Sequence, residues 1–292
     1  MEAAEFIQYV IAGLKSGSIY ALVALGFSVV YASTGIINFA QGEFFMLGGV
    51  LSVWFYSLGL PLPVAGIAAV VATAGLGIVF ERFALRRQRS ANPLVLVIIT
   101  IGGSMVMKSL ARHLFGPDEL SLPEFTPGPS IDIVGAAVER QALWVWGLTV
   151  VAVLALWWLY RKTRLGHAMR ACSISHDAAR LMGVDTARVV MISFGIAAAL
   201  GALGGFAVTP LTQTSWDAGA VIGVKGFAAA ILGGLGNPLA AVIGGLVLGL
   251  LESLSVAFIS SAYKDAISLL VLLIVLFVRP QGLFGSKRRE KV

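Results

Sequence analysis

Three hydrogen-bonding side chains, Asn38, Gln41 and Glu43, lie close together in the otherwise apolar stretch "NFAQGEFF". A small zwitterion needs acceptors for its ammonium group and donors for its carboxylate, and two amides and a carboxyl group supply both. We therefore predict that these residues line a translocation path for such a solute. A structural interpretation fits equally well: Asn38 caps a helix, and Glu43 lies in its first turn, where the helix dipole favours a negative charge.

Four other ionisable residues fall within apolar segments, where charged groups are costly and are functional candidates by default. Glu252 is assigned to the same path as Glu43, although Glu252 and Lys15 also suit a structural role as ion-pair partners inside a helix bundle. Lys108 and Arg112 are one helical turn apart near the end of a segment. Their long side chains can reach the polar interface, which explains both residues without a further role.

A second candidate site is the polar stretch "CSISHDAARLMGVD", residues 172–185. Ser173 or Ser175 can cap a helix at its N-terminus, and Gly183 can end it, so we expect a helix of about two turns, on the order of 10 Å long. An isolated helix of this length is marginally stable in water, so another surface must hold it. Ala178, Leu181 and Met182 form an apolar face that suits either a groove on a partner protein or the chain's own bundle.

Several kinds of chemistry are excluded by the residues that are missing. Cys172 is the single cysteine and the three histidines are widely separated, so neither a disulfide nor a metal site is expected. The stretch "GGLGNP" lacks the Gly-Lys-Ser/Thr ending of a phosphate-binding loop, and "LGVD" is not a nucleophile elbow. We therefore expect no enzymatic activity and no cofactor in this chain.

The composition is that of a membrane protein, with 58% hydrophobic and 12% charged residues and a mean hydropathy of +0.90. The sequence predicts an all-α polytopic membrane protein with eight to nine transmembrane helices in a single domain, 1–292. The seventh apolar segment is short and is followed by glycines and a proline, which indicates a broken or re-entrant helix. The predicted segments are 6–31, 36–57, 61–81, 93–115, 142–160, 188–210, 222–236, 238–259 and 264–279.

Charge placement orients these segments. By the positive-inside rule, three basic clusters are cytoplasmic, which places the loop 161–187 and the C-terminus inside. The acidic, Pro- and Gly-rich loop 116–141 should lie outside, together with the N-terminus. A net charge of +6 distributed in this way indicates orientation in a membrane, and no nucleic-acid partner is expected. The clusters are Arg82, Arg86, Arg87 and Arg89; Arg161, Lys162, Arg164 and Arg170; and Arg279, Lys287, Arg288, Arg289 and Lys291.

Most of the 34 glycines are interpreted as devices for close helix packing and not as a binding site. The stretches "GIINFAQGEFFMLGG" and "GLGNPLAAVIGG" share the order Gly, Asn, small residues and Gly-Gly at the start of a segment, a weak sign of an internal repeat.

Several stretches of the sequence resemble those of a known family. "DAARLMG" (177–183) looks like the Glu-Ala-Ala-x3-Gly loop of bacterial ABC-importer permeases, with Asp177 in place of Glu and without the later Ile-x-Leu-Pro. "GSIYALVALGFSVVYASTGIINFAQGEFFMLGG", "RLGHAMRA", "VKGFAAAILGGLGNPLAAVIGGLVLGLLES" and "RPQGLFG" resemble the LivH-type permease of branched-chain amino acid importers. The likeness covers nearly the whole chain except the outer loop 116–141.

The resemblance implies a role for the short helix as a coupling helix that docks on an ATP-binding subunit. It implies an assembly with a second related permease, two ATP-binding subunits that bind ATP and Mg²⁺, and a periplasmic solute-binding protein, in a bacterial inner membrane. The residues that would make the coupling contact are Ser175, His176, Asp177, Ala178, Ala179, Arg180, Leu181, Met182 and Gly183.

The expected function is therefore ATP-driven import of branched-chain or related hydrophobic amino acids by alternating access. One alternative is the same type of importer acting on urea or short amides. A second is an ion-coupled carrier in which Lys15, Glu43 and Glu252 move protons or sodium, although it leaves the cytoplasmic helix unexplained. A structural membrane scaffold is a third, and it needs none of the polar cluster.

Overall fold

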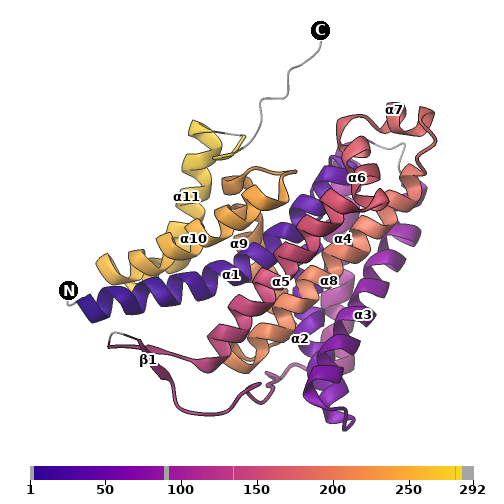
Figure 1. The fold of residues 1–292 in the computed structure, drawn as a ribbon. Coiled ribbons are helices and arrows are strands. Elements are labelled where there is room, and N and C mark those ends of the chain that lie inside the picture. Colours follow the sequence, from indigo (N-terminus) through magenta and orange to yellow (C-terminus); the bar gives the residue numbers. More distant parts are fainter. Residues whose placement is uncertain (1–2, 89–91, 134, 280, 285–292) are drawn as a thin grey trace.

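The computed structural model describes residues 3–88, 92–133, 135–279 and 281–284, and helices make up most of them (Figure 1). Each of the nine predicted apolar segments forms a helix. These are α1 (Ala3–Thr34), α2 (Gln41–Ser57), α3 (Leu62–Phe80), α4 (Pro93–Phe115), α5 (Arg140–Lys162), α8 (Thr186–Thr212), α9 (Ala218–Gly233), α10 (Pro238–Phe258) and α11 (Lys264–Val278).

The remaining elements are short and lie at the ends of the bundle. A π-helical turn, η1 (Glu81–Leu85), and a 3₁₀ turn, η2 (Arg86–Gln88), continue α3, and a second 3₁₀ turn, η3 (Ser261–Tyr263), precedes α11. The helices α6 (Arg164–Ile174) and α7 (His176–Leu181) form the loop between α5 and α8. A small antiparallel hairpin, β1 (Ile131–Ile133) with β2 (Ala136–Val138), lies in the loop 116–141 and was not anticipated from the sequence.

Seven helices among the described residues are long and apolar enough to cross a membrane, and α9 is a shorter apolar helix of 16 residues. The helix α2 has 17 residues. The predicted class, an all-α polytopic membrane protein with some short helices, is confirmed. Figure 1 shows α6 and α7 at one end of the bundle and the hairpin at the other, which is the arrangement that the charge distribution predicted for the two loops.

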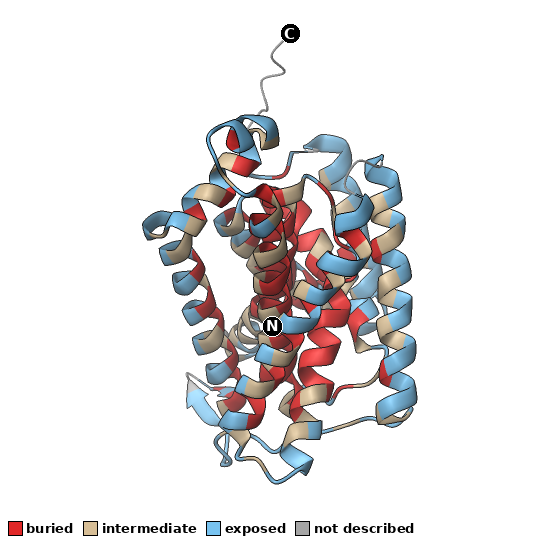
Figure 2. Cartoon of the chain, turned by 90° about the vertical axis from the view of Figure 1, so that its right-hand side faces the viewer, coloured by how far each residue is buried: buried red, intermediate tan, exposed pale blue. Residues whose placement is uncertain are grey.

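The core of the bundle is built from α1, α2, α8, α9 and α10, and Figure 2 shows the buried residues concentrated along its centre. The helices α1 and α10 cross antiparallel through glycines. A Cβ atom added to Gly17 would lie 2.8 Å from the Leu246 Cα, and one added to Gly13 would lie 2.9 Å from the Leu250 Cα. Cβ atoms do not approach backbone this closely, so the packing interpretation of the glycines is confirmed at this crossing.

The helix α2 begins inside the bundle and not at its end. The sequence predicted a segment starting at residue 36, but the helix starts at Gln41, whose side chain lies directly against Gly26 of α1. Gly26 precedes the end of α1 by eight residues, or about 12 Å of helix. The chain therefore turns at Gly35, which has a φ of +72°, and runs back into the bundle before α2 starts.

The helix α9 starts next to α2. A Cβ atom added to Gly219, in the first turn of α9, would lie 2.6 Å from the Gly42 carbonyl oxygen. The N-termini of these two short apolar helices thus meet in the interior, where only glycines allow the backbones to approach this closely.

Candidate functional site

The three polar residues at the start of α2 are all buried, with Glu43 only 2% exposed. The Asn38 Oδ1 atom accepts a hydrogen bond from the Ala40 N–H at 3.1 Å, which stabilises the turn before the helix. The N-cap residue itself is Ala40, so Asn38 is not the helix cap that the structural interpretation proposed. Glu43 does lie in the first turn, as that interpretation expected.

Gln41 and Glu43 connect α2 to different neighbours. The Gln41 Nε2 atom donates to the Ala197 carbonyl of α8 at 2.9 Å, whereas the Glu43 Oε1 atom accepts from the Ser104 hydroxyl of α4 at 3.0 Å. Two residues along a helix differ by about 200° in direction, so these side chains leave opposite faces of α2. The structure therefore places Gln41 and Glu43 at nearly the same level along α2, but Gln41 contacts α8 and Glu43 contacts α4.

Each of the three residues also has a buried polar atom with no hydrogen-bond partner in the described part of the chain. These atoms are the Asn38 Nδ2 donor and the acceptors Gln41 Oε1 and Glu43 Oε2. A buried polar group left unpaired costs about 1–3 kcal/mol. One donor and two acceptors held without partners are the set that a passing zwitterion could use.

Glu252 lies in a separate ionic network and is 1% exposed. Its Oε1 atom accepts from the Tyr20 hydroxyl at 3.0 Å and from the Lys225 ammonium at 2.9 Å, and its Oε2 atom accepts from the Ser268 hydroxyl at 3.0 Å. Lys264 lies 3.1 Å from the same carboxylate. The network joins α1, α9, α10 and α11, so the ion-pair interpretation of Glu252 fits these contacts.

Lys225 is a further buried charge of this network, and it was not predicted from the sequence. Its side chain is 10% exposed, and besides Glu252 it pairs with Asp265 at 2.7 Å. The rule that a charged residue inside an apolar segment needs a partner applies to "IGVKGF" as well and would have found it.

The other ionisable candidates have partners near the hairpin end of the bundle. Lys15 forms an ion pair with Glu139 at 2.7 Å, but Glu139 is half exposed and lies in the loop after β2, so this pair is at the end of the bundle and not inside it. Lys108 and Arg112 lie over the ring of Trp216, at 4.9 and 4.7 Å from its centre. A cation–π contact thus holds both side chains, in addition to any interaction with the membrane interface.

At the opposite end, α7 forms with the predicted start and end. The Ser175 hydroxyl accepts from the Ala178 N–H at 3.2 Å, and Gly183 closes the turn with a φ of +82°. Ala179 is buried and ties the helix to the bundle, next to Cys172 of α6. Burial raises the pKa of the Cys172 thiol.

The two exposed faces of α7 differ in chemistry. Ala178, Leu181 and Met182 are exposed, and the two large side chains are 89% and 84% accessible. His176 and Arg180, one turn apart, line a cavity between α7 and the bundle. The apolar face therefore does not lie on the chain's own bundle, which was the alternative left open by the sequence.

The architecture and these two polar regions can be compared with known proteins. The family described as "Branched-chain amino acid transport system / permease component" matches residues 9–276. The chain belongs to this family. Its members are transport permeases, so the protein is a membrane transport subunit and not an enzyme.

Individual relatives agree with the family assignment. The permease is 35% identical to the high-affinity branched-chain amino acid transport system permease protein LivH of Escherichia coli (strain K12), over 98% of both chains. It is 30% identical to the corresponding BraD protein of Pseudomonas aeruginosa, over 100% of this chain and 99% of that one. The solved structure of PsaBC from Streptococcus pneumoniae in complex with Fab shares the fold at a TM-score of 0.50 and 12% identity, covering 97% of this chain and 98% of that one.

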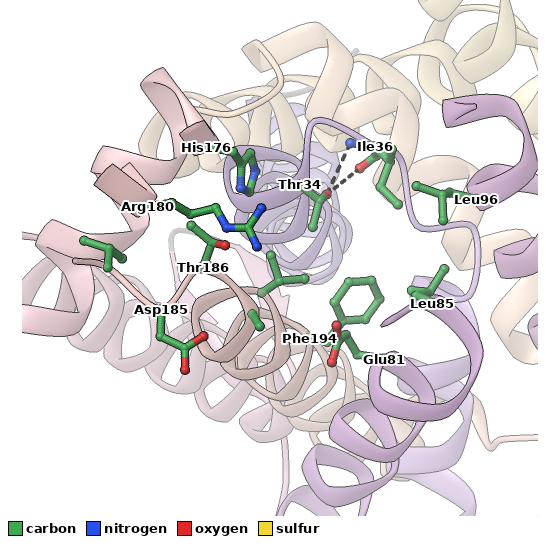
Figure 3. Close-up of a pocket in the computed structure, with 13 residues that line it drawn as sticks. Thr34, Ile36, Glu81, Leu85, Leu96, His176, Arg180, Asp185, Thr186 and Phe194 are labelled. Carbon is green, nitrogen blue, oxygen red and sulfur yellow. Dashed lines mark hydrogen bonds between the residues drawn. The ribbon is translucent and has the colours of Figure 1, made fainter. Parts of the chain in front are cut away.

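The cavity beneath α7 of the permease has a volume of about 610 Å³ (Figure 3). The end of α1, the turn η1, the start of α4 and the N-terminal part of α8 enclose it together with α7. Figure 3 shows Arg180 extending from α7 toward Thr186, and Glu81 on the opposite side next to Phe194. The family resemblance did not point to this cavity.

Proposed function

We propose that this permease is the membrane subunit of an ATP-driven importer of branched-chain amino acids in a bacterial inner membrane. It forms the translocation path together with a second, related permease. Two ATP-binding subunits carry ATP and Mg²⁺, and a periplasmic binding protein delivers the solute. The whole chain, 1–292, acts as one permease domain in this assembly. The family assignment and the likeness to LivH over 98% of both chains support this proposal.

The observation that carries the ATP-driven mechanism is the exposed apolar face of α7. A capped helix held by the buried Ala179 presents Leu181 and Met182 to solvent outside the membrane-spanning helices. Apolar side chains this exposed on a short rigid element suit insertion into a hydrophobic groove of a partner. In the importer this partner is the ATP-binding subunit, and α7 transmits its closure to the bundle.

The solute path is proposed to pass the start of α2, where Asn38, Gln41 and Glu43 hold unpaired polar atoms. Because α2 and α9 meet through the backbones of glycines, no interlocked side chains at this contact resist a small movement of one helix relative to the other. Such a movement would open a space beside the start of α2 during alternating access. Glu252 is proposed to hold α11 and α9 in place beside this path.

The test is uptake of labelled leucine by vesicles that contain the complete transporter and its binding protein. With ATP maintained inside, collapsing the proton and sodium gradients should leave uptake unchanged, whereas an ion-coupled carrier would stop. Excess valine or isoleucine should compete with leucine, and urea or acetamide should not. Competition by urea alone would assign the chain to the importers of amides.

The coupling role is tested by substitutions within the loop. Ala178→Arg places a charge on the apolar face, and Gly183→Pro replaces a residue with positive φ, so both should abolish uptake while the permease stays in the membrane. Ser173→Arg is the matched control, because Ser173 is exposed on α6. Normal uptake by Ala178→Arg would refute the coupling role.

A further inference from the structure

The loop between α8 and α9 carries Trp216, which lies closer to the hairpin end of the bundle than Glu43 does. Ser104 of α4 donates to the Glu43 carboxyl group at 3.0 Å, and Lys108 and Arg112 follow on the same face of α4, one and two turns later. Four helical residues advance by about 6 Å, so the two cations lie roughly 6 and 12 Å beyond the level of Ser104. Both cations lie over the ring of Trp216. The ring is therefore placed between the buried Glu43 and the hairpin end.

Two contacts hold this loop in its place. One is the cation–π contact of Trp216, and the other is a backbone bridge in which Thr214 and Leu120 exchange two hydrogen bonds, at 2.7 and 2.8 Å. The preceding residue, Gln213, has a φ of 61° and a ψ of 178°, a backbone conformation that glycine alone adopts readily. A strained loop keeps its shape only while its contacts hold it, so losing one of them favours release of the loop.

The two cations have no anionic partner in the described part of the chain. The side chains of Lys108 and Arg112 form neither a hydrogen bond nor an ion pair there, and their printed contact is the face of Trp216. The nearby Asp217 accepts from the Ser215 hydroxyl of its own loop at 2.6 Å. A cation on an aromatic face is held less strongly than a cation hydrogen-bonded to a carboxylate. A carboxylate that reaches the two cations should therefore replace the ring as their partner.

We propose that Lys108 and Arg112 form an outer binding site for the carboxylate of the solute, and that a bound carboxylate releases Trp216 and opens the way to Glu43. The inference rests on the proposed function, because the ligand is the imported amino acid arriving from the binding protein. The ammonium group of the solute next pairs with the Glu43 Oε2 atom, which has no partner in the described chain. Urea and short amides carry no carboxylate, so they leave the ring in place.

Release of the loop is measured by thiol labelling of Thr214→Cys in the full-length permease in nanodiscs, without ATP. The native Cys172 is replaced by alanine, so that one thiol remains. Thr214 is 4% exposed, and the new thiol should react slowly with N-ethylmaleimide. Leucine should raise the labelling rate saturably, by about fivefold or more, the lower end of usual coupling between two sites. Leucinamide, which lacks the carboxylate, should not. No effect of leucine, or an equal effect of leucinamide, overturns the proposal.

Variants in the same background identify the residues that respond. Lys108→Gln combined with Arg112→Gln should be labelled quickly without leucine and should not respond to it. Trp216→Ala should also be labelled quickly, whereas Trp216→Phe keeps an aromatic face and should stay slow. Trp157→Ala is the matched control, because Trp157 has the same kind of contact with Arg161, at 5.4 Å, on α5. Equal acceleration by Trp157→Ala, or a full leucine response in the double Gln variant, contradicts the proposal.

A disulfide tests whether the loop must move during transport. Leu120 and Thr214 form a hydrogen-bonded antiparallel pair, and the Cα atoms of such a pair are about 5.5 Å apart, within disulfide range. In vesicles with the complete transporter and ATP, oxidised Leu120→Cys/Thr214→Cys should lose leucine uptake, and dithiothreitol should restore it. The control Asp132→Cys/Ala137→Cys joins β1 to β2 and should transport normally after oxidation. Normal uptake by the first variant, with its thiols shown to be oxidised, overturns the gate.

The two proposals fail in different ways. If no vesicle shows ATP-dependent uptake, the importer function is wrong, and labelling in nanodiscs still decides whether a carboxylate releases the loop. If uptake is ATP-dependent but leucine does not change the labelling rate, the importer function stands and the outer carboxylate site is wrong.

Discussion

The substitution Leu181→Ser tests whether α7 is a docking element or simply an exposed loop. Leu181 is 89% exposed in the isolated permease, so its removal should change the stability of the permease by no more than about 0.5 kcal/mol. If the side chain is buried in a groove of the ATP-binding subunit, its loss costs about 1.5–3 kcal/mol of binding free energy. At 1.4 kcal/mol per factor of ten, the affinity should fall roughly 10- to 140-fold.

The assay is the dissociation constant of the ATP-binding subunit for the permease in nanodiscs, measured together with the thermal unfolding temperature. Leu58→Ser is the control, since Leu58 is also exposed but follows α2 at the far end of the bundle. We expect unfolding temperatures close to wild type for both variants and weaker binding for Leu181→Ser alone. An unchanged affinity of Leu181→Ser, or an equal loss in Leu58→Ser, would refute the docking argument.

Three further predictions concern the bundle. Glu252→Ala removes the 2.9 Å partner of the buried Lys225, which then keeps only Asp265, and should destabilise the permease by about 1–3 kcal/mol in thermal unfolding. The double replacement of Glu252 and Lys225 by Met should recover most of this loss, and a double variant no more stable than Glu252→Ala would contradict the network. Gly249→Leu should abolish monodisperse folded protein in size-exclusion chromatography because its Cβ would collide with Gly17, whereas Gly75→Leu, with nothing within 4 Å, should behave as wild type. Burial raises the pKa of Cys172, so at pH 7 its thiol should stay protonated and react slowly with a maleimide until detergent unfolds the chain; rapid labelling of folded permease would contradict this.

The sequence predicted the helices well because a membrane sets strict demands on each segment. The fourth segment, 93–115, coincides with α4, and the eighth, 238–259, differs from α10 by one residue. The start of α2 was placed too early, because residues 36–40 are apolar enough to extend the segment although the chain is still turning there. An apolar side chain indicates that a residue lies inside the membrane, but it does not indicate whether the backbone at that residue is helical.

The candidate site was only partly predictable. The caps of α7 follow from Ser175 and Gly183, which act on their nearest neighbours, so local sequence was sufficient. The partners of Glu252 come from helices up to 232 positions away, and no local pattern encodes that meeting. The cavity under α7 was missed for the same reason, since Glu81 and Arg180 are brought to its opposite sides only by the tertiary fold.

The crossing of α1 with α10 also constrains how the permease is made. Gly13 and Gly17 contact residues that are synthesised more than 200 positions later. At bacterial or eukaryotic translation rates of about 5–20 residues per second, α1 must wait in the membrane for tens of seconds before α10 arrives. During that time lipid, or a membrane chaperone, has to cover the glycine surface and Ser18 and Tyr20 beside it. The centre of the bundle is consequently among the last parts of the molecule to assemble, although α1, which forms one side of it, is synthesised first.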